Sequence, residues 1–247
     1  MLNRILAACL AAGILAGLSA AILQHFTTTP LILAAEAFET GGAAGLQHRA
    51  AMDGAGAARL IPAGSHDHSH SVAGQQEWAP GDGLERTFYS SVATIATAFG
   101  FALMLVSAML LGGAAITART GLAWAAAAFI ATGLAPSLGL SPELPGAAAA
   151  ELAARQLWWV GTAAATVAGL WLVLRLSTSW AIGAGVVLIV LPHLIGAPHP
   201  HELTSKVPAE LAGHFASASL VVQAVIWALV GATAGYVWQQ TGRQTAA

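Results

Sequence analysis

Six long apolar stretches divide this chain, and they constrain its fold more than any other feature. They lie near residues 5–26, 88–112, 121–140, 157–176, 180–197 and 215–238. About 20 mainly apolar residues are needed for an α-helix to cross the roughly 30 Å hydrocarbon layer of a membrane. Only 8% of the residues are charged and 57% are hydrophobic, whereas a soluble domain carries about 25% charged residues. The sequence therefore predicts an all-α membrane protein, a single integral membrane domain with six transmembrane helices.

Two of the six stretches give a weaker signal than the others. Pro136 interrupts the third, and a proline inside a helix removes a backbone hydrogen bond and clashes with the preceding turn. The fifth stretch is short. Five transmembrane helices with one re-entrant segment is therefore an alternative to six.

The charged residues predict which side of the membrane each connection occupies. All eleven acidic residues fall in the first, third and fifth connections, while the opposite side carries only Arg4, Arg119, Arg175 and Arg243. Short loops that face the cytoplasm are enriched in Lys and Arg. We therefore expect both termini inside and the acidic connections outside, in a multi-pass protein of the inner membrane. The net charge of −2 gives no reason to expect a nucleic-acid partner.

A long polar loop, roughly residues 27–86, follows the first stretch, and we expect its middle to be disordered. It contains the tract His66-Asp67-His68-Ser69-His70. Alternate side chains of an extended segment share one face, so His66, His68 and His70 could reach one metal ion. Imidazole nitrogen suits divalent transition metals. We interpret the tract as a weak metal-capture site, and a solvated polar loop is the alternative.

The fifth stretch ends in a segment rich in proline and histidine, which runs from Pro192 to Glu202. Its prolines predict a broken helix end. A histidine within hydrocarbon is costly and is a functional candidate by default. Three roles remain open for His193: metal ligand, lining of an ion pathway, or a hydrogen bond that packs helices. His199 and His201 are candidate metal ligands in the same segment.

Further candidates are expected at the outer ends of the stretches. His25 and His214 are candidate metal ligands, and Glu36, Glu143 and Glu202 are candidate vestibule carboxylates that concentrate cations. Two arginines near helix starts are interpreted as structural, Arg86 through its neighbour Glu85 and Arg155 through its neighbour Gln156.

Two pairs of glycines four residues apart indicate close helix packing: Gly13 with Gly17, and Gly231 with Gly235. Such spacing lets helix backbones approach in lipid, and we expect packing within the chain rather than dimerisation. The sequence contains no nucleotide-binding loop, no Ser/His/Asp order and no cysteine pair. An intramembrane enzyme would need an acid or base beyond His193, so we expect a protein that is not an enzyme.

Several blocks, in order along nearly the whole chain, resemble the CbtA family, proposed subunits of a cobalt transporter. The blocks are Thr29-Pro30-Leu31-Ile32-Leu33, Glu85-Arg86-Thr87, Pro142-Glu143-Leu144-Pro145-Gly146, Arg155-Gln156-Leu157-Trp158-Trp159, Pro192-His193-Leu194-Ile195-Gly196-Ala197-Pro198 and Pro208-Ala209-Glu210-Leu211. The resemblance implies cobalt uptake that supports cobalamin synthesis. It also implies a partner, a small single-span membrane protein of the CbtB type.

These observations lead to one main expectation and one alternative. The main expectation is an inner-membrane uptake permease, or permease subunit, for Co²⁺, Ni²⁺ or another divalent transition metal, with no tightly bound cofactor. The ion is captured at outer histidines and carboxylates. The alternative is an accessory membrane protein that binds metal and hands it to another transporter without conducting it.

Overall fold

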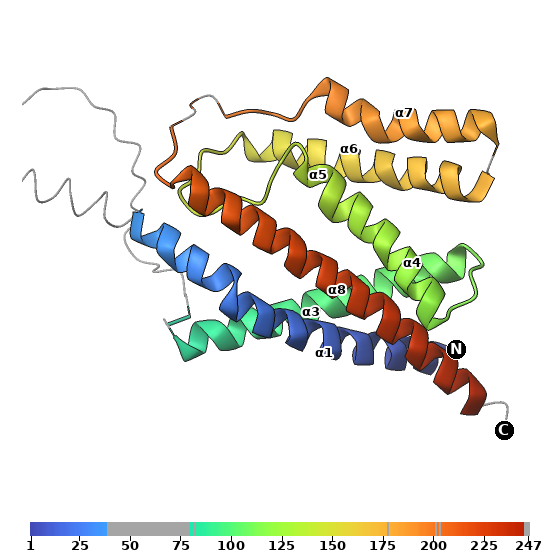
Figure 1. Ribbon diagram of the computed structural model, residues 1–247. Coiled ribbons are helices and arrows are strands. Elements are labelled where there is room, and N and C mark those ends of the chain that lie inside the picture. The colour runs from blue at the N-terminus through green and yellow to red at the C-terminus, as the bar shows by residue number, and fades with distance from the viewer. Residues whose placement is uncertain (39–79, 82, 177, 201, 203, 245–247) are drawn as a thin grey trace, which may run out of the picture.

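The computed structural model describes residues 1–38, 80–81, 83–176, 178–200, 202 and 204–244. Every regular element in these residues is helical (Figure 1). The labelled helices are α1 (Leu2–Phe26), α3 (Leu84–Leu111), α4 (Ala118–Phe129), α5 (Ala135–Ser137), α6 (Leu152–Trp171), α7 (Ser179–Ile195) and α8 (Ala209–Gln244). Two wider π-helical turns, η1 (Ile130–Leu134) and η2 (Leu172–Leu176), continue α4 and α6.

Five helices are long and apolar enough to cross a membrane. They are Leu2–Phe26, Leu84–Leu111, Ala118–Ser137, Leu152–Leu176 and Ala209–Gly242. The predicted all-helical membrane fold is thereby confirmed. The helix α7 has 17 residues, about 25 Å at 1.5 Å per residue, and lies along α6 (Figure 1). A sixth crossing by α7 stays a prediction.

One part of the predicted loop 27–86 is wrong, because its first residues form a helix, Thr28–Phe38. This helix has an apolar face that the sequence interpretation overlooked. Ala35 on that face is fully buried against Leu144 and Val207, and Ile32 packs beside it. The predicted His-rich middle of the loop, with His66, His68 and His70, lies outside the described residues.

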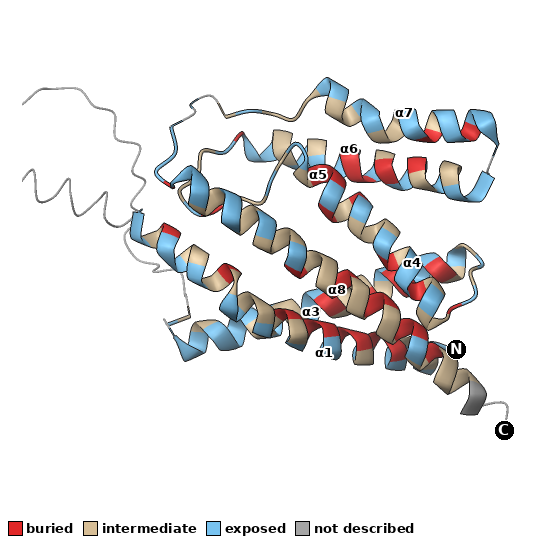
Figure 2. Cartoon of the chain, viewed as in Figure 1, coloured by how far each residue is buried: buried red, intermediate tan, exposed pale blue. Residues whose placement is uncertain are grey.

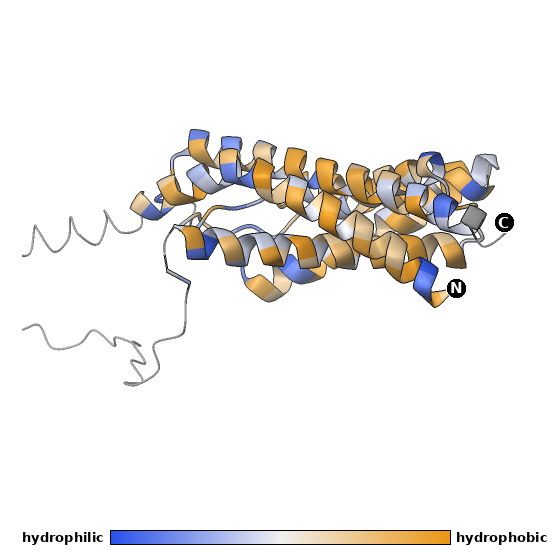
Figure 3. Cartoon of the chain, turned by 90° about the horizontal axis from the view of Figure 1, so that it is seen from below, coloured by the Kyte–Doolittle hydropathy of each residue, from blue (hydrophilic) through white to orange (hydrophobic). Residues whose placement is uncertain are grey.

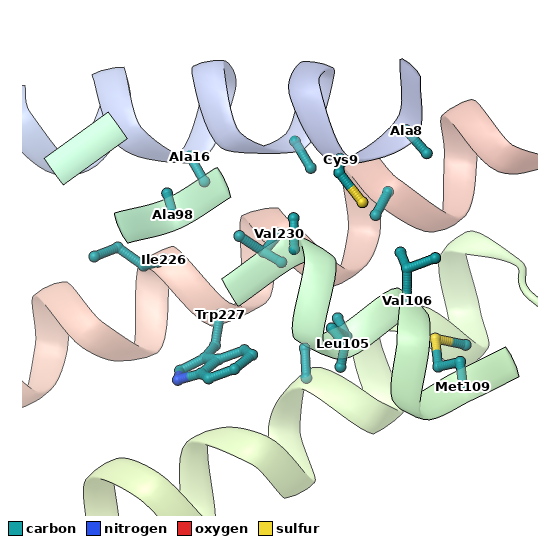
Figure 4. Close-up of a cluster of buried hydrophobic side chains, with 14 of the residues drawn as sticks. Ala8, Cys9, Ala16, Ala98, Leu105, Val106, Met109, Ile226, Trp227 and Val230 are labelled. Atoms are coloured by element: carbon teal, nitrogen blue, oxygen red, sulfur yellow. The ribbon is translucent and has the colours of Figure 1, made fainter. Parts of the chain in front are cut away.

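The main core lies where α1, α3, α4 and α8 meet, and there the buried residues concentrate (Figure 2). Figure 4 shows the small side chains Ala8 and Ala16 on α1 at one side of this core and the larger Met109 and Trp227 at the other. The Trp227 ring stacks on Phe101 with centroids 4.7 Å apart. Lipid offers no hydrophobic drive between helices, so close packing of small residues holds such a bundle together.

The predicted role of the glycine pairs, packing within the chain, is confirmed at this core. A Cβ added at Gly13 would lie 2.7 Å from Phe99 Cα, so α1 and α3 touch through their backbones. A Cβ added at Gly231 would lie 2.5 Å from Ala125 Cβ and would also meet the backbone of Gly121. The glycines therefore let α1 approach α3, and α8 approach α4.

The helices α6 and α7 form a hairpin beside this four-helix core. They touch through Gly169 and Gly185, where a Cβ on Gly169 would lie 2.6 Å from the Gly185 carbonyl oxygen. The hairpin reaches the rest of the molecule mainly through contacts of α6 with η1 and α5. Its helices are largely exposed or half-buried (Figure 2).

The turn η1 explains how the third span continues across Pro136. The Ala135 N–H donates to the Ile130 carbonyl five residues earlier instead of four. Proline has no N–H, and its ring clashes with the carbonyl four residues before it in an ordinary α-helix. The wider turn precedes that proline, and the helix Ala118–Ser137 remains one membrane-length element.

Both chain ends lie at the same end of the bundle (Figure 1). Arg4, near the start of α1, donates through Nη2 to the Trp238 carbonyl at 2.6 Å, and its guanidinium lies 4.3 Å from the Trp238 ring centre. Hydrophobic residues dominate the long helices between the two ends of the bundle (Figure 3). We call the end opposite the termini the acidic end, because its connections and helix starts carry Glu36, Glu85, Glu143, Glu151, Glu202 and Glu210.

Candidate functional site

The first of two polar clefts at the acidic end lies between the end of α1, the helix Thr28–Phe38 and the start of α3. We call it the α1–α3 cleft. It has a volume of 520 Å³, and His25, Glu36 and Arg86 line it together with Gln24, Thr29, Thr87, Ser90 and Ser91. Two of the predicted site residues, His25 and Glu36, are therefore brought together here.

Glu36 forms a two-pronged ion pair with Arg86. Arg86 Nη1 donates to Glu36 Oε2 at 3.0 Å, and Nη2 donates to Oε1. Paired bonds between a guanidinium and a carboxylate are among the stronger hydrogen bonds in proteins. The hydrogen bond from Arg86 and its positive charge hold the pKa of Glu36 below its ordinary value. Glu36 thus stays ionised at neutral pH.

This pairing corrects the prediction for Arg86, which named its neighbour Glu85. Glu85 instead accepts a hydrogen bond from the Gly81 N–H, at 3.0 Å from N to Oε2. The side chains of adjacent helix residues such as Glu85 and Arg86 point in different directions. The folded connection instead brings Glu36, fifty residues earlier in the chain, to the Arg86 guanidinium.

The second polar cleft, which we call the α5–α6 cleft, has a volume of 610 Å³. It is lined by Glu143 and Arg155, by the carboxamides of Gln156 and Gln223, and by Thr132, Gly133, Ser137 and Ser141. Arg155 Nη2 lies 2.7 Å from Glu143 Oε2, and both side chains are about one-quarter to one-third exposed. The expected structural role of Arg155 is thus met by Glu143 and not by Gln156.

The helix α7 continues through Pro192 and ends within the predicted proline- and histidine-rich segment, and His193 lies against α6. The helix ends at Ile195, and Gly196 follows with φ of +90°, a conformation that suits glycine. The His193 ring lies edge-on to Trp158, with centroids 5.9 Å apart. His193 Nε2 and Trp158 Nε1 are both buried without a hydrogen-bond partner in the described part of the chain. His193 therefore faces the protein interior and not the acyl chains.

The other predicted residues lie apart from these groups. His199, His214 and Glu202 are exposed, and His201, His66, His68 and His70 lie outside the described residues. Within residues 1–38, 80–81, 83–176, 178–200, 202 and 204–244, no group of three or more His, Cys, Asp or Glu side chains could hold one metal ion. The described histidines do not by themselves form a closed metal site, and their role as ligands stays a prediction.

Sequence reasoning missed the amide groups. Gln24 accepts a hydrogen bond from Thr94 at 3.0 Å beside the first cleft, and Gln156 and Gln223 line the second. A signal was present for Gln223, because it is a strongly polar side chain in the middle of the last apolar stretch. Polar side chains at such depth are unusual and often functional.

A comparison with protein families agrees with the blocks noted in the sequence. A family model described as "Probable cobalt transporter subunit (CbtA)" matches residues 2–239. The chain belongs to the CbtA family. No curated protein and no solved structure matches it. Together with five membrane-length helices, the family makes this chain a multi-pass membrane protein of a group assigned to cobalt transport.

Proposed function

We propose that this protein is the inner-membrane subunit through which a cobalt uptake system captures and admits the ion, in support of cobalamin synthesis. Six helices cross the membrane, namely the five of membrane length and α7, and both termini lie in the cytoplasm. The shared end of the termini supports this topology, because Arg4, Arg119 and Arg175 lie near it. Positive charge collects on the cytoplasmic side of membrane proteins.

One observation carries the proposal: His25 and Glu36, from two separate helices, line one cleft at the acidic end. Imidazole and carboxylate are both ligands for divalent transition metals. The hydroxyls of Thr29, Thr87 and Ser90 in the same cleft can hold the water of a hydrated ion. Glu36 remains charged because Arg86 lowers its pKa. The cleft thus offers a first binding point for a hydrated cation.

The other predicted ligands extend this capture surface. The tract with His66, His68 and His70 concentrates metal ahead of the cleft, and His199, His201 and His214 follow the break at α7. Glu143 and Glu202 add vestibule carboxylates. His193 Nε2 is buried without a hydrogen-bond partner among the described residues, so an ion must enter between α6 and α7 to reach this nitrogen. No resident cofactor takes part, since cobalt is the cargo.

The driving force comes from outside this chain, because the sequence has no nucleotide-binding loop. A membrane potential of ~100 mV contributes about 4.6 kcal/mol for a divalent ion, twice the value for one charge. The partner is a small single-span membrane protein of the CbtB type. The alternative function is metal binding and transfer to another transporter without conduction, which the limited ligand sets of the described residues would also permit.

Uptake of radioactive cobalt into liposomes tests the proposal, with the purified protein alone and with its small partner. We expect uptake that falls when His25→Ala, Glu36→Gln or His193→Ala is introduced. Glu85→Gln is the matched control, since Glu85 stands at the same helix start but does not line the cleft. Metal binding without uptake in either preparation would favour the accessory function instead.

A further inference from the structure

The α5–α6 cleft reaches from the acidic end into the membrane. Its lining includes Glu143 and Arg155 near the start of α6, and Gln223 on α8. Gln223 lies eight residues after Phe215, where the last apolar stretch begins, so it is ~12 Å deeper along the helix at 1.5 Å per residue. Thr132 and Gly133 line the cleft from η1, within the third spanning helix.

The two carboxamides of this cleft, Gln156 and Gln223, form no hydrogen bond or ion pair with other described residues. Moving an amide from water to an environment without hydrogen-bonding partners is unfavourable. A partnerless carboxamide at the depth of Gln223 therefore needs water or a polar ligand. The cleft supplies the space for one, with a volume of 610 Å³.

The backbone that faces Gln223, on the third spanning helix, is irregular. A Cβ added at Gly133 would lie 2.6 Å from Gln223 Oε1, so the amide oxygen occupies the place a side chain would take. Gly133 belongs to the π-helical turn η1, and such turns are frequent at functional sites. Irregular backbone at membrane depth is tolerated where it is buried in protein or lines a water-filled cavity.

We propose that the α5–α6 cleft is the outer half of a hydrated permeation route, in which Gln223 contacts the passing divalent cation. This inference rests on the proposed function, since it assumes that the chain conducts. The donors in the deep part are the Gln223 amide oxygen and the Thr132 hydroxyl. Amide and hydroxyl oxygens hold a transition metal more weakly than imidazole does. Weak binding suits a pathway, because the ion must also leave.

The Glu143–Arg155 ion pair defines the mouth of this route. Its two charges cancel, so the cleft is close to neutral when no ion is present. An arriving divalent cation competes with the guanidinium for the Glu143 carboxylate. Arg155 thereby opposes the passage of monovalent cations, which compete less well for a carboxylate because they carry half the charge.

Cysteine labelling tests whether the cleft is wet. In a Cys9→Ala background, Gln223→Cys is exposed to a membrane-impermeant thiol reagent applied from the acidic side. Val221→Cys is the matched control, because Val221 lies two residues away on α8, is 57% exposed and does not line the cleft. The cysteine thiolate attacks the reagent, and the thiolate forms in water and not in hydrocarbon. We expect Gln223→Cys to react at least about tenfold faster, and cobalt to slow the reaction.

Transport by variants that need no label provides the second measurement. We expect Gln223→Leu to lower the maximal rate of cobalt uptake about tenfold, and Gln223→Asn to retain part of that rate. Equal labelling of the two cysteines, or normal uptake by Gln223→Leu, would overturn the inference. Absence of uptake by the wild-type protein with its partner would instead defeat the proposed function and the route with it. The labelling difference would still stand as a property of the cleft.

Discussion

The two clefts at the acidic end contain the same kind of Arg–Glu ion pair but differ in the glutamine side chain that lies near each pair. Each has an arginine in the first turns of a helix paired with a glutamate from the preceding connection, Arg86 with Glu36 and Arg155 with Glu143. Beside the α1–α3 cleft, the Gln24 carboxamide accepts a hydrogen bond from Thr94. In the α5–α6 cleft, the Gln223 carboxamide has no partner among the described residues.

The helix packing beneath each cleft follows the same division. Below the α1–α3 cleft, Gly13 and Gly17 bring α1 into backbone contact with α3. At the α5–α6 cleft, the helix Ala118–Ser137 widens into the π-helical turn η1, and α6 belongs to the hairpin outside the main core. The difference teaches that a similar charge pair can stand over tightly packed helices in one cleft and over looser packing in the other.

The largest expected effect tests the close packing of α1 against α3 below the α1–α3 cleft. Gly13→Ala places a Cβ 2.7 Å from Phe99 Cα, and such overpacking costs about 1–3 kcal/mol. Gly161→Ala on α6 is the control, because a Cβ there meets nothing within 4 Å. We expect the first variant to unfold at lower denaturant concentration in mixed micelles and the second to match or slightly exceed the wild type. Equal stability of both variants would mean that the α1–α3 contact is not tight.

The next effect separates binding from conduction. His25→Ala should raise the cobalt concentration needed for half-maximal uptake about tenfold, with little change in the maximal rate, because it removes an imidazole from the proposed first binding point. A loss in the maximal rate instead would place His25 in the conducting step and remove the contrast between the clefts. Initial rates over a range of cobalt concentrations decide between these outcomes.

A smaller effect tests the hydrogen bond between Thr94 and Gln24 at the α1–α3 cleft. The Thr94 hydroxyl lies 3.0 Å from Gln24 Oε1 and 2.9 Å from the Ser90 carbonyl oxygen. Thr94→Val removes both contacts, and we expect a loss of about 0.5–1.5 kcal/mol of stability. Thr97→Val is the control, because the Thr97 hydroxyl donates to the Ala93 carbonyl within the same helix. Similar losses in the two variants would show that the Gln24 bond contributes little. The measurement is the shift in the unfolding midpoint.

The smallest effect concerns the Glu36–Arg86 pair and its pH dependence. The pKa of Glu36 is lower in the folded protein than its ordinary value of about 4.3. The pair therefore stabilises the fold fully above that ordinary pKa, and its contribution disappears as pH falls through the lowered value. Both side chains are about one-third exposed, so the contribution is about 0.2–1 kcal/mol. The stability difference between wild type and Glu36→Gln should persist at pH 7 and vanish in acid.

Local patterns predicted the helices well, because a membrane-length apolar run needs no knowledge of its neighbours. The end of α7 within the proline- and histidine-rich segment and the intramolecular role of Gly13 and Gly231 followed from the same kind of reasoning. The contacts that form the clefts could not be predicted from local sequence patterns. Glu36 meets Arg86 across fifty residues of chain, and Gln223 meets Gly133 across ninety. Such pairings depend on how whole helices pack, and no periodicity in the sequence encodes them.

The contact between Arg4 and Trp238 has a consequence for how the protein is made. The helix α8 packs against α1, α3 and α4, so a core that α1 begins is completed only after α8 has been synthesised. At about 5–20 residues per second, the ribosome needs roughly ten seconds or more to deliver α8 after α1 has emerged. During that interval the faces of α1 and α4 that later contact Gly231 and Trp238 await their partner, and a nascent chain cut short before α8 is a natural target for membrane quality control.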